Sequence, residues 1–119
     1  MKKTVVIGAS TNPERYAYLA TQSLSNKGFK VVPVGLKEGR IGDVQILTGF
    51  PKIENVHTIT LYVGPKNQAH WAEYIIGLKP QRVIFNPGTE NEDFQQQLSN
   101  LGIAVEEACT LVLLNRGVY

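Results

Sequence analysis

The chain has 119 residues, of which 43 % are hydrophobic and 18 % are charged. This length and apolar content suit one globular domain with one core and argue against a two-domain enzyme. The net charge of +2 is too small for the dense basic surface of a dedicated nucleic-acid-binding protein. The single cysteine, Cys109, cannot form an intramolecular disulfide, and with only two histidines a Cys/His zinc site is not expected.

The N-terminal segment and the cysteine content indicate where in the cell the protein is located. Only a short apolar run precedes Gly8, far shorter than the ~20 residues of a membrane span and shorter than the core of a signal peptide. A lone cysteine is typical of a reducing compartment. We therefore expect a soluble, cytoplasmic protein that binds neither membranes nor nucleic acids.

Short β-branched runs alternate with longer segments of helical periodicity, which predicts repeated βαβ units. The first apolar run, residues 4–7, lacks polar alternation, as do strands buried on both faces of a parallel sheet. Apolar residues at helical spacing predict a helix over residues 14–27, ended by Gly28. The second strand is predicted at residues 30–34.

The rest of the chain follows the same pattern after one segment that is harder to interpret. Residues 35–57 contain several glycines and no helical stripe, so we expect mostly loop with at most a short helix. Thr89 and Glu92 have the spacing of a capping box at a helix start. The remaining predicted elements are a strand at 58–63, a helix from Pro65, a strand at 82–85, a helix from Thr89 to about Asn100, a strand at 103–105 and a short helix at 109–114.

Five strands joined by right-handed helical crossovers predict a Rossmann-like three-layer α/β/α fold with a five-stranded parallel sheet, formed by residues 1–119 as a single domain. Such sheets bind ligands beyond the carboxyl ends of their strands, near the point where the strand order reverses. The turns after the first four strands are therefore the candidate binding segments.

The turn after the first strand, residues 8–15, is predicted to bind a phosphate. Exposed backbone amides and the dipole of the following helix favour an anion there, and Thr11 adds a further hydroxyl donor. The same residues also fit a helix cap, with an asparagine at the N-cap and a proline at the first helical position. The candidate phosphate-binding residues are Gly8, Ala9, Ser10, Asn12, Pro13 and Arg15.

The pattern around the second strand disfavours NAD. The first turn lacks the second and third glycines of the dinucleotide fingerprint G-x-G-x-x-G, and no carboxylate follows the second strand until Glu38. A ribose that carries a phosphate, as in NADP or coenzyme A, would instead be bound by Lys37 or Arg40, with Leu36 as an apolar surface for adenine. Residues 1–60 contain eight Lys or Arg against four Asp or Glu, whereas residues 61–119 contain four against six.

Several segments resemble one known family. They are residues 6–10 together with Asn12, Pro13 and Arg15, residues 31–34, residues 41–42, and residues 86–88. These segments are similar to those of the small stand-alone CoA-binding proteins, which are related to the CoA-binding N-terminal domain of the succinyl-CoA synthetase α subunit. The resemblance extends over nearly the whole chain, but Gly35-Leu36 stand where the family more often has Asn-Pro.

The resemblance implies a Rossmann-like domain that binds coenzyme A, with the diphosphate over the first turn and the adenine near the ends of the second and third strands. The remaining candidate residues that it implies are Val34, Gly35, Leu36 and Lys37, then Val63, Gly64 and Pro65, and then Asn86, Pro87 and Gly88.

No set of residues predicts a self-contained catalytic apparatus. Glu106 and Glu107 are neighbours on a strand and point to opposite faces, and Cys109 is expected to be a small buried side chain. The leading hypothesis is a protein that binds coenzyme A or an acyl-CoA and is not a stand-alone enzyme. The alternatives are an NADP-dependent reductase and a Rossmann interaction module without a ligand. Residues 111–114 are expected either to seal the core or to form a dimer contact, and the protein partners considered are a second copy of the chain, as a homodimer, or an unidentified protein.

Overall fold

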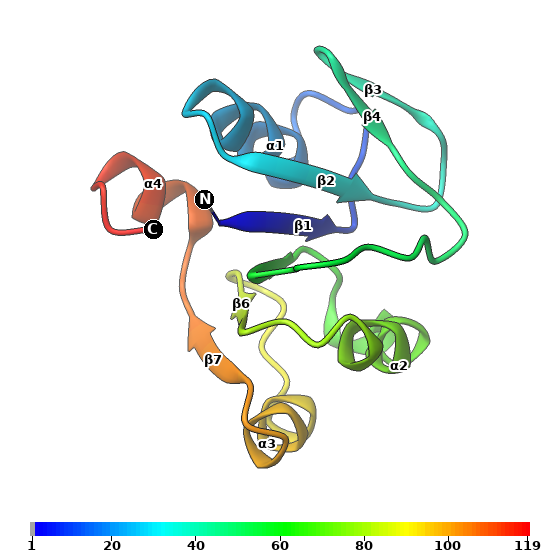
Figure 1. Cartoon of the computed structure of the whole chain (residues 1–119), viewed down its shortest axis with the longest axis vertical. Coiled ribbons are helices and arrows are strands. Elements are labelled where there is room, and N and C mark those ends of the chain that lie inside the picture. The colour runs from blue at the N-terminus through cyan, green and yellow to red at the C-terminus, as the bar shows by residue number, and fades with distance from the viewer. Residues whose placement is uncertain (1) are drawn as a thin grey trace.

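A computed structural model describes residues 2–119, and its centre is one parallel sheet. The strand order is β2-β1-β5-β6-β7, which confirms the predicted five-stranded, Rossmann-like α/β fold (Figure 1). The order reverses between β1 and β5, so the carboxyl ends of these two strands flank the expected ligand site. The strands are β1 (Lys3–Ile7), β2 (Lys30–Val34), β5 (Thr58–Leu61), β6 (Arg82–Phe85) and β7 (Ala104–Glu107).

Helices cover both faces of the sheet and complete the three layers (Figure 1). One face packs against α1 and α4, and the other packs against α2 and α3. The helices are α1 (Tyr16–Asn26), α2 (Ala69–Gly77), α3 (Glu92–Asn100) and α4 (Thr110–Asn115), with a 3-10 turn, η1 (Pro65–Asn67), before α2.

The side chains of each strand alternate between two hydrophobic cores. On β1, Val5 and Ile7 point to the core beneath α2 and α3, whereas Val6 points to the core beneath α1 and α4. All three are fully buried, and the same alternation on β6 places Ile84 opposite its two neighbours. The continuous apolar runs of the sequence therefore reflect burial on both faces of the sheet.

The structure corrects the expectation for residues 35–57. They contain a two-stranded antiparallel hairpin, β3 (Gly39–Ile41) and β4 (Val44–Ile46), and no helix. The two-residue turn begins at Gly42, whose φ of +60° suits glycine. Ile41 and Ile46 are buried in the core beneath α1 and α4. Strands of three residues are too short to produce a readable alternation of polar and apolar residues.

The start of α3 also differs from the prediction. Asn91, rather than Thr89, is the N-cap, because the Asn91 side chain accepts a hydrogen bond from the Phe94 amide at 3.2 Å. The Thr89 hydroxyl is buried and instead donates to the Asn86 carbonyl oxygen at 2.8 Å. The predicted N-cap of α3 was therefore wrong by two positions, because Thr89 closes the turn that precedes the helix.

Within residues 2–119, none of the helices combines the length and the apolar composition that crossing a membrane requires.

Candidate functional site

The first turn is tied to the second strand by its first two amides. Gly8 has a φ of +95°, which favours glycine. The amides of Gly8 and Ala9 both donate to the Val34 carbonyl oxygen at 3.0 Å. These two amides are therefore not free to bind a phosphate, which corrects the expectation that the whole turn presents its amide hydrogens to one.

The rest of the turn is ordered by its own polar side chains. The Asn12 amide donates to the Ser10 hydroxyl at 3.0 Å, and the Asn12 side-chain oxygen accepts from the Glu14 amide at 3.0 Å. Asn12 thus forms a local turn and is not a helix N-cap, and Pro13 is not the first helical residue. The helix begins at Tyr16 with Arg15 at the N-cap, which has no side-chain capping bond.

Two groups of amide donors remain available beyond the carboxyl end of β1. Within residues 2–119, the Ser10 and Thr11 amides have no hydrogen-bond partner. The first amides of α1 likewise have no intrahelical partner and carry the positive end of the helix dipole. An anion at this position would meet these donors together with the Arg15 side chain.

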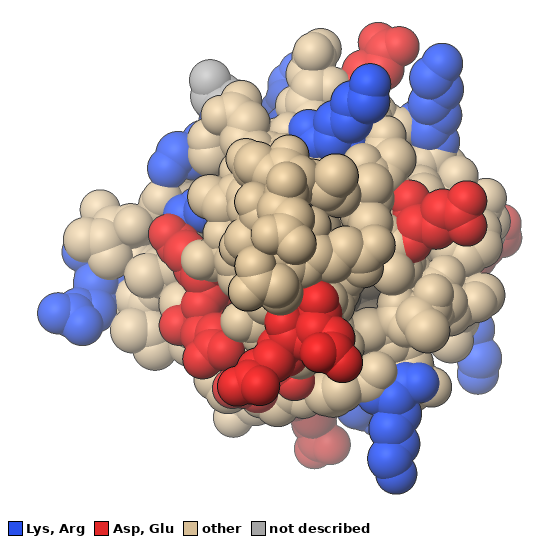
Figure 2. All heavy atoms as spheres, turned by 90° about the horizontal axis from the view of Figure 1, so that it is seen from below, with Lys and Arg blue, Asp and Glu red and all other residues tan. Residues whose placement is uncertain are grey.

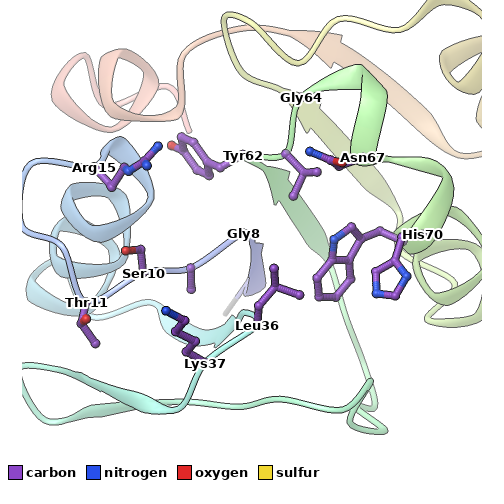
Figure 3. A pocket seen from close by; sticks show the side chains of 13 residues that line it. Gly8, Ser10, Thr11, Arg15, Leu36, Lys37, Tyr62, Gly64, Asn67 and His70 are labelled. Atoms are coloured by element: carbon purple, nitrogen blue, oxygen red, sulfur yellow. The ribbon is translucent and has the colours of Figure 1, made fainter.

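A cavity of about 760 Å³ opens over the turn (Figure 3), and its volume lies within the roughly 300–1,000 Å³ of small-molecule sites. It is bounded by the first turn, the segment after β2, and the segment from the end of β5 to α2. Its lining residues are Gly8, Ala9, Ser10, Thr11, Arg15, Leu36, Lys37, Tyr62, Val63, Gly64, Asn67, His70 and Trp71.

A second cavity of about 400 Å³ adjoins the first. The two share Gly8, Ser10, Arg15, Tyr62 and Gly64, so they lie on either side of the same turn. The second cavity extends to the segment after β6 and to the start of α1. Together they provide an elongated space across the carboxyl ends of β1, β5 and β6.

The structure brings ten of the predicted site residues together around these cavities. Eight line the larger cavity, and two more line only the smaller one. They are Gly8, Ala9, Ser10, Arg15, Leu36, Lys37, Val63 and Gly64, and then Pro87 and Gly88.

Six predicted residues line neither cavity and belong to the segments next to the cavity linings. They are Asn12, Pro13, Val34, Gly35, Pro65 and Asn86. Asn86 is buried, and its side-chain amide donates to the Thr60 hydroxyl at 2.7 Å and to the Leu61 carbonyl oxygen at 3.0 Å. Its side-chain oxygen accepts from the Thr110 amide at 2.9 Å, so Asn86 joins β5 to the start of α4.

Several cavity residues were not predicted from the sequence. In the larger cavity these are Tyr62, Asn67, His70 and Trp71. Three of them have the spacing i, i+3, i+4 of one helical face, which is the signal that could have identified them. The His70 ring lies 5.1 Å from that of Phe50 and 5.5 Å from that of Trp71, measured between centroids.

The charged side chains that line the two cavities are all positive. Arg15 and Lys37 line them, and among the described residues neither lining contains an aspartate or a glutamate. Arg40, the alternative cation, donates to the Asp43 carbonyl oxygen at 3.1 Å within its own hairpin and lines neither cavity. Burial raises the pKa of Tyr62 to about 12, which keeps its hydroxyl neutral.

Acidic side chains gather elsewhere on the molecule. Figure 2, which views the structure from the lower side of Figure 1, shows a group of them together. Glu92 and Asp93 in the first turn of α3 and Glu107 on β7 border one shallow surface. Glu106 pairs instead with Arg82 at 3.4 Å, whereas Glu107 accepts from Gln95 at 3.0 Å.

An open parallel sheet with a cavity at its strand-order switch point defines a Rossmann-like α/β protein with a candidate small-molecule site. Residues 2–115 match the model of the family described as CoA binding domain. The chain belongs to this CoA-binding-domain family. No curated protein matches the chain.

Solved structures share the fold. An uncharacterized protein with 48 % sequence identity has a TM-score of 0.96, and the match covers 100 % of this chain and 98 % of the other. A hypothetical protein from Pyrococcus horikoshii OT3 has 26 % identity and a TM-score of 0.84, with 97 % and 82 % of the two chains covered. The protein called cell-free ID.343 from Thermus thermophilus has 21 % identity and a TM-score of 0.85, with 99 % and 90 % covered, which supports the fold alone.

Proposed function

We propose that the protein binds coenzyme A or an acyl-CoA in the two adjoining cavities and acts as a binding protein rather than as a stand-alone enzyme. One observation carries the proposal: the cavity at the switch point combines free backbone amides with Arg15 and Lys37 and has no carboxylate among its described lining residues. Membership of the CoA-binding-domain family supports the choice of ligand.

The ligand is oriented by the chemistry of the lining. The diphosphate lies over Ser10 and Thr11, where their amides, the start of α1 and Arg15 supply hydrogen bonds and positive charge. Lys37 is the cation that binds the ribose phosphate. A ribose that carries a phosphate is bound by a positively charged side chain, at the position where the free ribose hydroxyls of NAD are bound by a carboxylate. The adenine lies near Leu36 and Val63, and the long arm extends through the smaller cavity toward Gly88.

Ligand titration tests this proposal. Thermal-shift measurements and equilibrium dialysis with CoA, NADP and NAD are expected to show stabilisation and binding by CoA. Arg15→Ala removes a charge-assisted hydrogen bond and is expected to lower the affinity for CoA by about tenfold to a hundredfold. Ser10→Trp is expected to abolish binding by filling the space over the turn. Arg116→Ala, which removes an exposed arginine beyond the end of α4, is the matched control and should bind CoA like the wild type.

The alternatives predict different results in the same experiment. Stabilisation by NADP but not by CoA would favour an NADP-dependent reductase. Stabilisation by none of the three compounds would leave a Rossmann interaction module without a nucleotide ligand. Equal loss of affinity in Arg15→Ala and Arg116→Ala would place the ligand elsewhere on the protein.

A further inference from the structure

We propose that Asn67 reads the base of the bound nucleotide and selects adenine over guanine. This inference rests on the proposed binding of CoA and deepens it, since it names the residue that recognises one end of the ligand. It follows from the asymmetry of the larger cavity, the surroundings of Asn67 and the hydrogen-bonding capacity of an amide.

The two ends of the larger cavity have different chemistry (Figure 3). Ser10, Arg15 and Lys37 lie toward the α1 end, and the labelled Asn67 and His70 lie toward the α2 end. The apolar lining residues Trp71 and Val63 belong to α2 and to the segment just before η1. A nucleotide has the same asymmetry, because its phosphates are charged and its base presents flat apolar faces. The base therefore fits the α2 end when the phosphates occupy the α1 end.

The walls of the α2 end suit a flat ring. Leu36 is 77 % exposed and lines the same cavity as Trp71 (Figure 3). The indole itself is 4 % exposed and is fixed from behind, with ring centroids 5.3 Å from Phe50 and 6.2 Å from Tyr74. The exposed Leu36 side chain can cover one face of a base, and the small exposed part of the fixed Trp71 ring adds apolar surface that does not have to reorganise.

Asn67 lies at the edge of this space on a rigid support. Its backbone amide donates to the Gly64 carbonyl oxygen at 3.0 Å, which closes η1. The next residue, Gln68, is buried and donates from its side chain to the carbonyl oxygens of Val63 at 2.8 Å and Thr89 at 2.6 Å. The Asn67 side chain points into the cavity (Figure 3) and has no hydrogen-bond partner within residues 2–119.

A free side-chain amide has the donor and acceptor that adenine requires. Its oxygen accepts from the N6 amino group of adenine, and its NH₂ donates to the adjacent ring nitrogen N7. The corresponding edge of guanine presents two acceptors, O6 and N7, which match Arg or Lys rather than Asn. Asp at the same position accepts but cannot donate, and it instead matches the N1–H and N2–H₂ donors on the other edge of guanine.

The test measures the base preference of the wild type, Asn67→Asp and Asn67→Leu with ADP, GDP and CoA. Trp71 is the single tryptophan and lines the cavity, so its fluorescence reports a base that binds beside it. The wild type is expected to bind ADP about tenfold or more tightly than GDP. Both variants are expected to lose this preference while remaining folded, because Asn67 is exposed. Asn26→Asp, at the exposed end of α1, is the control and should keep the preference.

The outcomes separate this inference from the proposed function. Wild-type protein that binds CoA but binds ADP and GDP equally overturns the role of Asn67 and leaves CoA binding intact. The same conclusion follows if Asn67→Asp and Asn67→Leu both keep the wild-type ratio. Wild-type protein that binds none of the three compounds overturns both proposals.

Discussion

Gly35→Ala is expected to destabilise the protein by displacing the first turn. A Cβ at Gly35 would lie 2.4 Å from the Ala9 carbonyl oxygen and 3.4 Å from the side chain of Ile46. Ordinary carbon–oxygen contacts begin near ~3.3 Å, so the turn and the end of β2 would have to separate by about 1 Å. Overpacking of this kind costs about 1–3 kcal/mol.

The expected effect is a fall in the melting temperature of roughly 4–12 °C, at roughly 4 °C for each kcal/mol in a chain of this size. Gly77→Ala is the matched control, because a Cβ there meets nothing within 4 Å and the residue ends α2. Since alanine reduces the conformational freedom of the unfolded chain, the control is expected to gain up to about 1 kcal/mol. Urea and thermal denaturation measure both variants. Equal stability of the two would refute the proposed close contact between Gly35 and Ala9.

Three further predictions concern the core, a helix cap and a buried phenol. Leu98→Ala empties a fully buried position on α3 and is expected to cost about 2–5 kcal/mol in urea denaturation; a loss under 1 kcal/mol would contradict the packing described. Asn91→Ala removes the α3 N-cap and is expected to cost about 1 kcal/mol, whereas the exposed Ser99→Ala should change little. The pKa of Tyr62 is raised from 10.0 to about 12 by burial, so its contribution to stability is complete below pH 10 and is lost as the pH rises toward 12. Denaturation across this range should show a smaller loss for Tyr62→Phe, and an equal loss would argue against a raised pKa.

The sequence predicts the sheet well because its three central strands, β1, β5 and β6, are buried on both faces. Runs such as residues 5–7 and 83–85 are apolar without alternation and end at turn residues, so the strands that contain them are readable along the chain. The start of α1 is not readable in the same way. Asn12 and Pro13 suit both a helix start and a local turn, and the choice depends on the hydrogen bonds made with Ser10 and Glu14.

The binding segments could be located from the sequence, but not all of their residues. Carboxyl ends of parallel strands share one edge of the sheet, which places the turn after β1 beside the end of β5. Which face of the segment from Asn67 to Trp71 turns toward that edge depends on how η1 and α2 dock. That the Gly8 and Ala9 amides are occupied depends on the register between β1 and β2, which brings Val34 beside Ile7.

The double hydrogen bond from Gly8 and Ala9 to Val34 makes the first turn and the end of β2 one rigid unit. A ligand that contacts both does not have to draw them together, so little ordering entropy is lost on association. Docking is therefore expected to proceed without a slow conformational step, with affinity differences among variants appearing mainly in dissociation rates. The two amides are expected to exchange slowly with solvent deuterium whether or not a ligand is present.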